Sequence, residues 1–235
     1  DWSSVSLLYR ALLGERASST PRLCRLAQEW TKLSPLHPPQ PPLQSPLTPI
    51  EREESLLRAL YTQVTGRVRY VGLEFGRHSF QPAPPEQTLD RGFGDCKDRA
   101  TLMIALASCL KIPLEFVMVR TTSMGRLPLS GTASLNAFNH AALYSPSLDR
   151  YFDPTVSHHD IWALPYDDQG AQVIRVNPQK KEVPLRPSAS PPSPLLTIPY
   201  APSSAHQSHW DIKMIDQPMN QIRVTWTLRG VLASR

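Results

Sequence analysis

Residues 94–102 read Gly-Asp-Cys-Lys-Asp-Arg-Ala-Thr-Leu and lead into a continuous apolar run. This pattern predicts a helix over about 95–110 with Cys96 in its first turn. At that position, the unpaired backbone N–H groups and the helix dipole stabilise a thiolate. Asp95 and Asp98 are expected to cap the start of the helix rather than to act in catalysis.

Two motifs further along the chain supply the partners that a nucleophilic thiol requires. Phe138-Asn139-His140 lies on one predicted strand, and Phe152-Asp153-Pro154 ends the next. A turn-like stretch joins them, so a hairpin would bring His140 within about one residue of directly opposite Asp153. An imidazole exchanges protons near neutral pH, and a carboxylate can orient its second ring nitrogen. The order Cys, His, Asp therefore predicts an acyl-transfer site.

Each of these residues also has an ordinary structural interpretation. Taken alone, Cys96 and His140 would usually be buried core residues, and Asp153 before a proline would usually be a turn residue. Their occurrence in this order, with Gly-Asp before the cysteine, favours a site. Lys97 is expected to be exposed, although its charge would also favour a thiolate.

The remaining sequence predicts helices before the Cys96 helix and strands after it. Helices are expected over 4–14, from Pro21, and from Pro49, the last behind a Thr48–Glu51 capping box. Residues 76–94 are expected to form a long loop. Strands are expected over 68–75, 114–121, 138–144, 150–153, 172–176 and from 221 onward.

The 25 prolines fall mainly in two clusters that divide the chain. Such stretches favour extended, solvated backbone, so we interpret both clusters as exposed spacers. The domain map is then a first domain over 1–180 with a Pro-rich insertion at about 34–49, a Pro-rich linker over 181–203, and an incomplete C-terminal β unit over 204–235.

Composition limits the class of protein. Of the 235 residues, 40% are hydrophobic and 19% are charged, which is typical of a globular protein. The net charge of +5 is scattered without a basic run, so no nucleic-acid partner is expected. No stretch reaches the ~20 apolar residues of a membrane-spanning helix, and no signal peptide is visible. The sequence has no glycine-rich phosphate loop. No cofactor is expected.

The cysteines and a histidine pair raise two further questions. Three cysteines are too few for a disulfide framework, and the odd number leaves at least one thiol free. Cys24 and Cys109 lie in apolar helical patterns, so we interpret them as buried small residues rather than as a disulfide pair. His158, His159 and Asp160 lack a second ligand pair at zinc spacing, so we interpret them as a loop and expect no metal.

The motifs GDCKDRATL at 94–102, FNH at 138–140 and FDPT at 152–155 resemble the bacterial transglutaminase-like superfamily. They are most similar to a branch that carries GDCKD and usually follows a β-rich domain of unknown function (DUF3857). The resemblance covers residues 1–180. It implies an α+β, papain-like fold in which the cysteine helix packs on an antiparallel sheet, with the start of a C-terminal β unit beyond it.

The resemblance also implies roles for single residues. Cys96 would be the nucleophile, His140 the base and Asp153 the orienting carboxylate. A protein or peptide substrate and a periplasmic or secreted location are also implied. The neighbouring β domains of that branch are expected to be missing from this chain.

Two functions compete for this pattern. The first is cysteine-dependent acyl transfer on peptide or glutamine amides through a thioester, with hydrolysis preferred over transamidation because water is always present. The backbone N–H of Cys96 would be one oxyanion donor, and Tyr70 is the candidate for the second. The alternative is a catalytically inactive peptide-binding or assembly module of the same fold. A reactive Cys96 would favour the enzyme, and an inert one the module.

Overall fold

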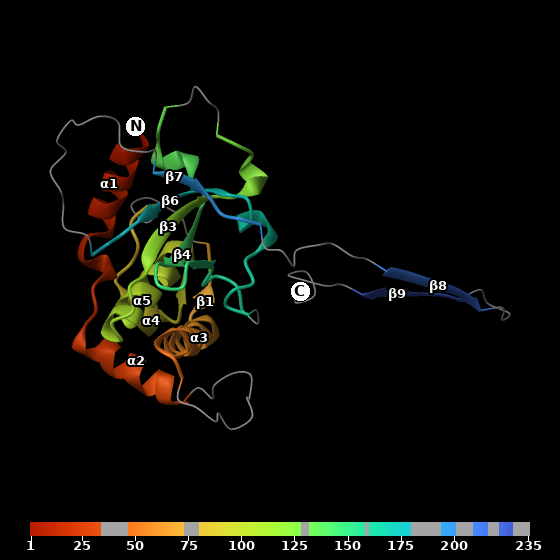
Figure 1. The fold of residues 1–235 in the computed structure, drawn as a ribbon, viewed down its shortest axis with the longest axis horizontal. Coiled ribbons are helices and arrows are strands. Elements are labelled where there is room, and N and C mark those ends of the chain that lie inside the picture. The colour runs from red at the N-terminus through yellow and green to blue at the C-terminus, as the bar shows by residue number, and fades with distance from the viewer. Residues whose placement is uncertain are drawn as a thin grey trace.

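The computed structural model describes residues 1–33, 47–72, 80–127, 132–157, 160–179 and 194–200, and the backbone of 209–215 and 221–227. Within these residues, an antiparallel sheet forms the centre and helices pack on one of its faces (Figure 1). The expectation of an α+β fold with the Cys96 helix on an antiparallel sheet is therefore confirmed.

The helices precede most of the sheet in the sequence. They are α1 (Trp2–Leu13), α2 (Pro21–Leu33), α3 (Pro49–Arg67), α4 (Pro85–Arg91) and α5 (Cys96–Cys109). As predicted, α3 begins at a capping box in which Thr48 and Glu51 satisfy each other's backbone N–H groups. The central helix is α5, which contacts α2, α3, α4, β3 and β4 and is buried over 96–107. The helix that carries Cys96 is thus fixed from several sides.

The main sheet has the strand order β5-β4-β3-β6-β7, and every pair in it is antiparallel. Its strands are β3 (Glu115–Arg120), β4 (His140–Ser145), β5 (Arg150–Phe152), β6 (Gln172–Val176) and β7 (Leu195–Thr197). Two short strands, β1 (Arg69–Tyr70) and β2 (Phe93–Gly94), pair in parallel beside it. Near the C-terminus, β8 (His209–Ile215) and β9 (Gln221–Thr227) form an antiparallel pair.

Side-chain alternation gives the sheet two buried faces. One face packs on α1 and α5, through residues such as Phe116, Met118 and Leu143. The other face, which includes Val117 and Val119, is covered by Leu164 and Ala171 of the 160–171 segment and by Ile198. Because both faces are covered, residues from a helix and from a late loop can meet at the end of one strand.

Three sequence expectations need correction. Residues 76–94 are not one long loop, because α4 and β2 form within the described part of that range. The strand expected over 68–75 is limited to β1 in the described residues. Strand β7 and the fully buried Ile198 lie inside the range expected to be an exposed linker. Proline confines such a segment to the edge of a sheet, which is where β7 lies.

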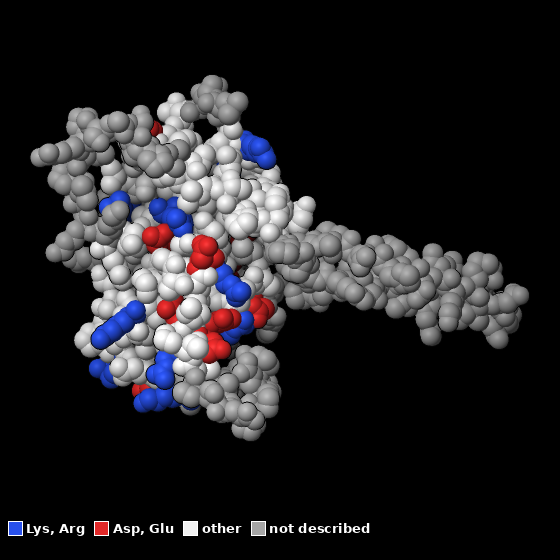
Figure 2. Space-filling model, in the orientation of Figure 1, with Lys and Arg blue, Asp and Glu red and all other residues white. Residues whose placement is uncertain are grey.

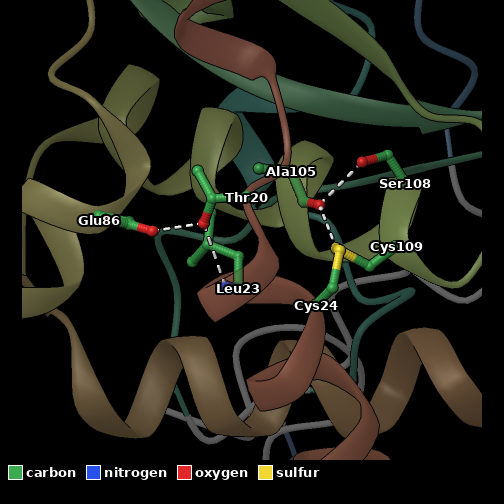
Figure 3. Close-up of a disulfide and its surroundings, with 7 residues drawn as sticks. All are labelled: Thr20, Leu23, Cys24, Glu86, Ala105, Ser108 and Cys109. Carbon is green, nitrogen blue, oxygen red and sulfur yellow. Dashed lines mark hydrogen bonds between the residues drawn. A yellow bond between two sulfur atoms is a disulfide. The ribbon is translucent and has the colours of Figure 1, made fainter.

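A disulfide joins α2 to the last turn of α5, contrary to the sequence expectation. Cys24 and Cys109 are bonded, with their Cα atoms 5.0 Å apart and a sequence separation of 85 (Figure 3). Each cysteine looks like a small apolar residue of a helix, and only the packing of α2 against α5 brings the two together. Cys96 is the free cysteine of the chain, and it is buried.

Charges of both signs are mixed on the protein surface. Figure 2 shows basic and acidic side chains interspersed over the face in view, as expected from the scattered charges of the sequence. Among the described residues, no helix combines the length and apolar character needed to cross a bilayer.

Candidate active site

Cys96 is the first residue of α5, directly after the N-cap Asp95. Asp95 Oδ1 accepts a hydrogen bond from the Asp98 N–H, and Asp98 accepts one from the Asp95 N–H, so the predicted capping role of both aspartates is confirmed. Gly94 is required for close packing here, because a Cβ at this position would lie 2.9 Å from the Asp98 Cβ. Asp98 also accepts a 2.7 Å bond from the Ala83 N–H, which ties the preceding loop to the helix.

Lys97 is not exposed as expected. Its side chain forms an ion pair with Asp95, and the residue is only 4% exposed. Burying an unpaired ammonium group would be costly, so the ion pair explains how Lys97 is accommodated next to Cys96.

His140 begins β4, and the residue before it fixes this strand end. The Asn139 side chain accepts a 3.0 Å bond from the Thr121 N–H and donates a 2.8 Å bond to the Thr121 Oγ1. The Asn139 N–H donates to the Val119 carbonyl of β3. Asn139 therefore anchors the start of β4 to the end of β3 and limits the positions that His140 can take.

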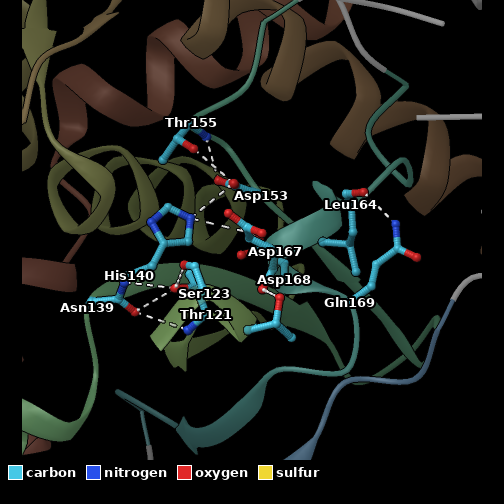
Figure 4. A network of polar contacts seen from close by, with 11 residues as sticks. Thr121, Ser123, Asn139, His140, Asp153, Thr155, Leu164, Asp167, Asp168 and Gln169 are labelled. Atoms are coloured by element: carbon cyan, nitrogen blue, oxygen red, sulfur yellow. Dashed lines mark hydrogen bonds and ion pairs between the residues drawn. The ribbon is translucent and has the colours of Figure 1, made fainter. Parts of the chain in front are cut away.

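His140 and Asp153 are brought together. Nε2 of His140 lies 3.0 Å from Oδ2 of Asp153 (Figure 4). The last pair of the β4–β5 ladder is Leu143 with Phe152, so Asp153 continues opposite Ala142, two residues from His140. The two side chains are thus diagonal neighbours on one face rather than nearly opposite, a separation that their lengths still bridge.

The loop after β5 holds the Asp153 carboxylate. Thr155 donates to it twice, from its backbone N–H at 2.7 Å and from its Oγ1 at 2.8 Å. Burial favours the neutral form of Asp153, but the charge and hydrogen bond of His140 and the bonds from Thr155 hold the pKa of this carboxyl below its usual value. Asp153 is therefore ionised at neutral pH.

The His140 imidazole is stabilised in its charged form. Burial opposes that form, yet the charge of Asp153, hydrogen bonds with Asp153 and Cys96, and the charge of Asp168 raise the pKa of His140 well above its ordinary value. Because Nε2 faces Asp153, the remaining ring nitrogen, Nδ1, is the one available to the Cys96 thiol. This arrangement favours an imidazolium beside the thiol.

Asp168 is a functional candidate that the sequence analysis missed. It lies on the short 3₁₀ helix η5 (Tyr166–Asp168), and its Oδ2 is 3.9 Å from Nε2 of His140. Burial, together with the charge of Asp153, raises the pKa of Asp168 to about 7, although the charge of His140 opposes the shift. No motif surrounds Asp168 in the sequence; the available signal was an acidic pair, Asp167-Asp168, close before a predicted strand.

A pocket of about 230 Å³ opens beside Cys96 and His140, and both residues line it. Most of its other walls are apolar or aromatic, and they come from α1, β3 and the segment before β4. The lining residues also include Tyr9, Phe80, Lys97, Phe116, Met118, Leu135, Asn136, Phe138, Asn139 and Ala141. The thiol and the imidazole therefore share one accessible space.

Tyr9 and Tyr70 lie in different surroundings. Tyr9 is 5% exposed, and its ring packs on Phe116 with the centroids 4.9 Å apart. Burial, and then the electrostatic effect of the neighbouring Cys96, raise the pKa of Tyr9 well above its usual value, so its hydroxyl keeps its proton. Tyr70 is 44% exposed on β1 and is not among the described residues that line the pocket. His158 and His159 lie outside the described residues.

One group of side chains also has the spacing of metal ligands. His140, Asp153 and Asp168 each offer one atom, and these atoms lie within 4.8 Å of one another. However, Nε2 of His140 and Oδ2 of Asp153 are already bonded to each other, and a cation would have to replace that bond. We therefore interpret the group as a proton-exchanging cluster rather than as a metal centre.

The comparison with family models agrees with this architecture. Residues 44–144 match the model of the Transglutaminase-like superfamily. This range contains Cys96 and His140 and ends before Asp153. A search of curated proteins found no match.

Two solved structures resemble the chain. One is a "putative protease" from Parabacteroides distasonis, with a TM-score of 0.50 and 14% identity over 72% of this chain and 29% of that one. The other is a "putative cysteine protease" from Cytophaga hutchinsonii, with a TM-score of 0.40 and 17% identity over 71% and 44%. This chain thus spans less than half the length of either protein. The similarity to the Parabacteroides distasonis structure supports only the fold. That fold is transglutaminase-like and papain-like.

Proposed function

We propose that this protein is a cysteine-dependent acyl-transfer enzyme in which Cys96 is the nucleophile, His140 the general acid and base, and Asp153 the carboxylate that orients His140. One observation carries the proposal. A free thiol at a helix N-terminus shares a pocket with an imidazole whose other ring nitrogen is bonded to a buried carboxylate. These are the parts that thiol-dependent acyl transfer needs.

In the proposed reaction, the Cys96 sulfur attacks the carbonyl carbon of an amide. The carbon–nitrogen bond breaks, and the amine leaves with a proton from His140, which gives a thioester on Cys96. Water then attacks the thioester while His140 takes its proton. The carbon–sulfur bond breaks, the acid is released, and the thiol–imidazole pair is restored. Asp153 stabilises the charged and correctly oriented imidazole in both steps.

The oxyanion that forms on attack needs hydrogen-bond donors. The backbone N–H of Cys96 is one, because the first N–H groups of a helix have no partner within it. For the second donor, Tyr70 stays a candidate from the sequence, and we add the Tyr9 hydroxyl. Tyr9 lines the pocket with Cys96, and its hydroxyl keeps its proton and has no hydrogen-bond partner among the described residues.

Hydrolysis is preferred over transamidation for this site. Transamidation requires a bound amine, and besides Cys96 and His140 the polar residues in the pocket lining are few: Tyr9, Lys97, Asn136 and Asn139. The alternative function is a catalytically inactive peptide-binding or assembly module. The intact His140–Asp153 pair beside a free thiol favours the enzyme over that module.

The test is a peptide library that contains glutamine, incubated with and without a primary amine and read by mass spectrometry. Cleavage or deamidation supports hydrolysis, and amine incorporation alone supports transamidation. Cys96→Ala should abolish both reactions. Asp153→Asn should retain the fold but lower turnover, by up to ~10⁴-fold if it acts as the equivalent aspartate of serine proteases does. Tight peptide binding without turnover would support the module.

Two further proposals concern the family branch and the compartment. The GDCKD motif supports membership of the branch associated with DUF3857, which has a protein or peptide substrate. The Cys24–Cys109 disulfide supports a periplasmic or secreted location, because such bonds persist in oxidising compartments.

A further inference from the structure

We propose that Asp168 is a positioning residue for His140: its buried carboxyl is a second negative partner of the imidazole, beside Asp153, and it widens the pH range over which His140 stays protonated next to Cys96. This inference rests on the proposed function only for the role of His140 in turnover. The interaction between the two side chains can be tested without a substrate.

The geometry places two carboxyl groups at one imidazole nitrogen. Nε2 of His140 is 3.0 Å from Asp153 Oδ2 and 3.9 Å from Asp168 Oδ2 (Figure 4). Both aspartate side chains are 2% exposed. A charge–charge contact at this distance, screened little by water, is strong enough to change which groups hold protons.

One oxygen of the Asp168 carboxyl, Oδ2, is buried without a hydrogen-bond donor in the part of the chain that the structure describes. By contrast, Gln169 beside it donates through its side chain to the Leu164 carbonyl and has a clear role in the fold. Burying a carboxyl without a donor is costly, so its position against His140 and Asp153 requires a compensating interaction.

The charged groups around this cluster come from several elements. His140 faces Asp153 after β5, Cys96 at the start of α5, and Asp168 on η5. Asp168 in turn faces His140, Asp153 and its exposed neighbour Asp167. Asp153 also interacts electrostatically with two further groups, Arg99 of α5 and Tyr61 of α3.

These contacts give Asp168 two states with different effects. When protonated, it lies close enough to Asp153 for a hydrogen bond between the two carboxyls. When it ionises, near neutral pH, it adds a second negative charge next to the imidazole. His140 then needs a higher pH to lose its proton, so the imidazolium that delivers a proton to the leaving amine persists further into the alkaline range.

The experiment is a ¹⁵N-histidine NMR titration of the full chain, with EDTA present because the cluster is also spaced for a cation. In Asp168→Asn, which keeps the shape and removes the charge, His140 should lose its proton at a pH lower by about one unit or more. The matched control is Asp167→Asn, which removes an exposed charge from the same turn and should leave the His140 midpoint within a few tenths of a unit. An unchanged midpoint in Asp168→Asn would overturn the proposal.

The wild-type chain provides a second measurement if Asp168→Asn fails to fold. The ¹³C signal of the Asp168 carboxyl should show ionisation near neutral pH while His140 is still protonated. An Asp168 carboxyl that keeps its proton until His140 has lost its own would contradict the inference.

A third readout links the inference to turnover. Once a substrate is found, Asp168→Asn should match wild-type turnover below about pH 6 and lose activity first on the alkaline side. If Asp168→Asn lowered turnover by the same factor at every pH, Asp168 would have a structural role only, and the inference would be wrong. Failure of the proposed function would appear separately, as a wild-type chain without Cys96-dependent turnover.

Discussion

Nη1 of Arg99 donates a 3.2 Å hydrogen bond to the backbone carbonyl of Thr155. Arg99 lies one turn after Cys96 on α5, and Thr155 is the residue that holds the Asp153 carboxylate. The helix that carries the thiol therefore also supports the loop that orients the imidazole. A displacement of α5 would disturb both sides of the site together.

Thr155→Val should weaken the site without unfolding the protein. Valine keeps the shape and the backbone N–H bond but removes the Oγ1 bond to Asp153. A hydrogen bond to a charged group contributes roughly 1.5–3 kcal/mol, so both stability and the fixed position of Asp153 should decrease. We expect turnover to fall, with a smaller effect than that of Asp153→Asn, as measured on the same peptide substrate. Thr62→Val, whose hydroxyl donates to the Arg58 carbonyl within α3, is the control and should keep its turnover.

Tyr9→Phe tests the proposed oxyanion donor. The substitution keeps the ring that packs on Phe116 and removes only the hydroxyl. Loss of one such donor lowers kcat by about 10²–10³-fold, so we expect a loss of that order. Iodoacetamide should still label Cys96 at the wild-type rate, since alkylation forms no oxyanion.

The control for this variant is Tyr144→Phe, a buried tyrosine outside the pocket whose hydroxyl donates to Asp149. It should cost stability but not kcat. A Tyr9→Phe variant with wild-type kcat would contradict the role of the Tyr9 hydroxyl and leave Tyr70 as the candidate for the second oxyanion donor.

Removal of the disulfide should lower stability strongly but leave the thiol chemistry intact. The Cys24–Cys109 bond closes a loop of 85 residues, for which chain entropy predicts about 4–5 kcal/mol. We expect Cys24→Ala/Cys109→Ala to unfold at a much lower urea concentration. Before reduction, iodoacetamide should label Cys96 alone. Labelling of Cys24 or Cys109 without a reductant would contradict this pairing.

The sequence was most informative where function requires a fixed local pattern. The Cys96 helix start, with its aspartate cap, and the strand that follows the FNH motif are local signals, and the structure has both, although the strand begins only at His140, the last residue of the motif. The positions that were missed depend on packing between distant segments. Cys24 meets Cys109 only through the contact of α2 with α5, and Asp168 meets His140 only because the 160–171 segment covers the second face of the sheet.

Proline-rich composition was a poor guide to the edge of the sheet. Prolines exclude a central strand, but they allow an edge strand, so Leu195–Thr197 pairs with β6 inside a stretch that resembles a spacer. The prediction that Lys97 is exposed was wrong for a related reason. A lysine is normally exposed, and only the neighbouring Asp95, which is fixed as the helix cap, makes its burial acceptable.

Asp168→Asn should change how stability depends on pH. The folded-state pKa of Asp168 is raised to about 7, above the ordinary value of about 3.9 that the unfolded chain retains. The folded state therefore binds more protons between these values, and this residue's contribution to stability is present below about pH 4 and is lost as the pH rises to about 7. The amide cannot ionise, so the variant should gain stability relative to wild type across that window. Urea unfolding at pH 4.5 and pH 8 measures this difference, and Asp167→Asn is the control that should show no such trend. A difference between wild type and Asp168→Asn that is the same at both pH values would show that Asp168 does not titrate in this range.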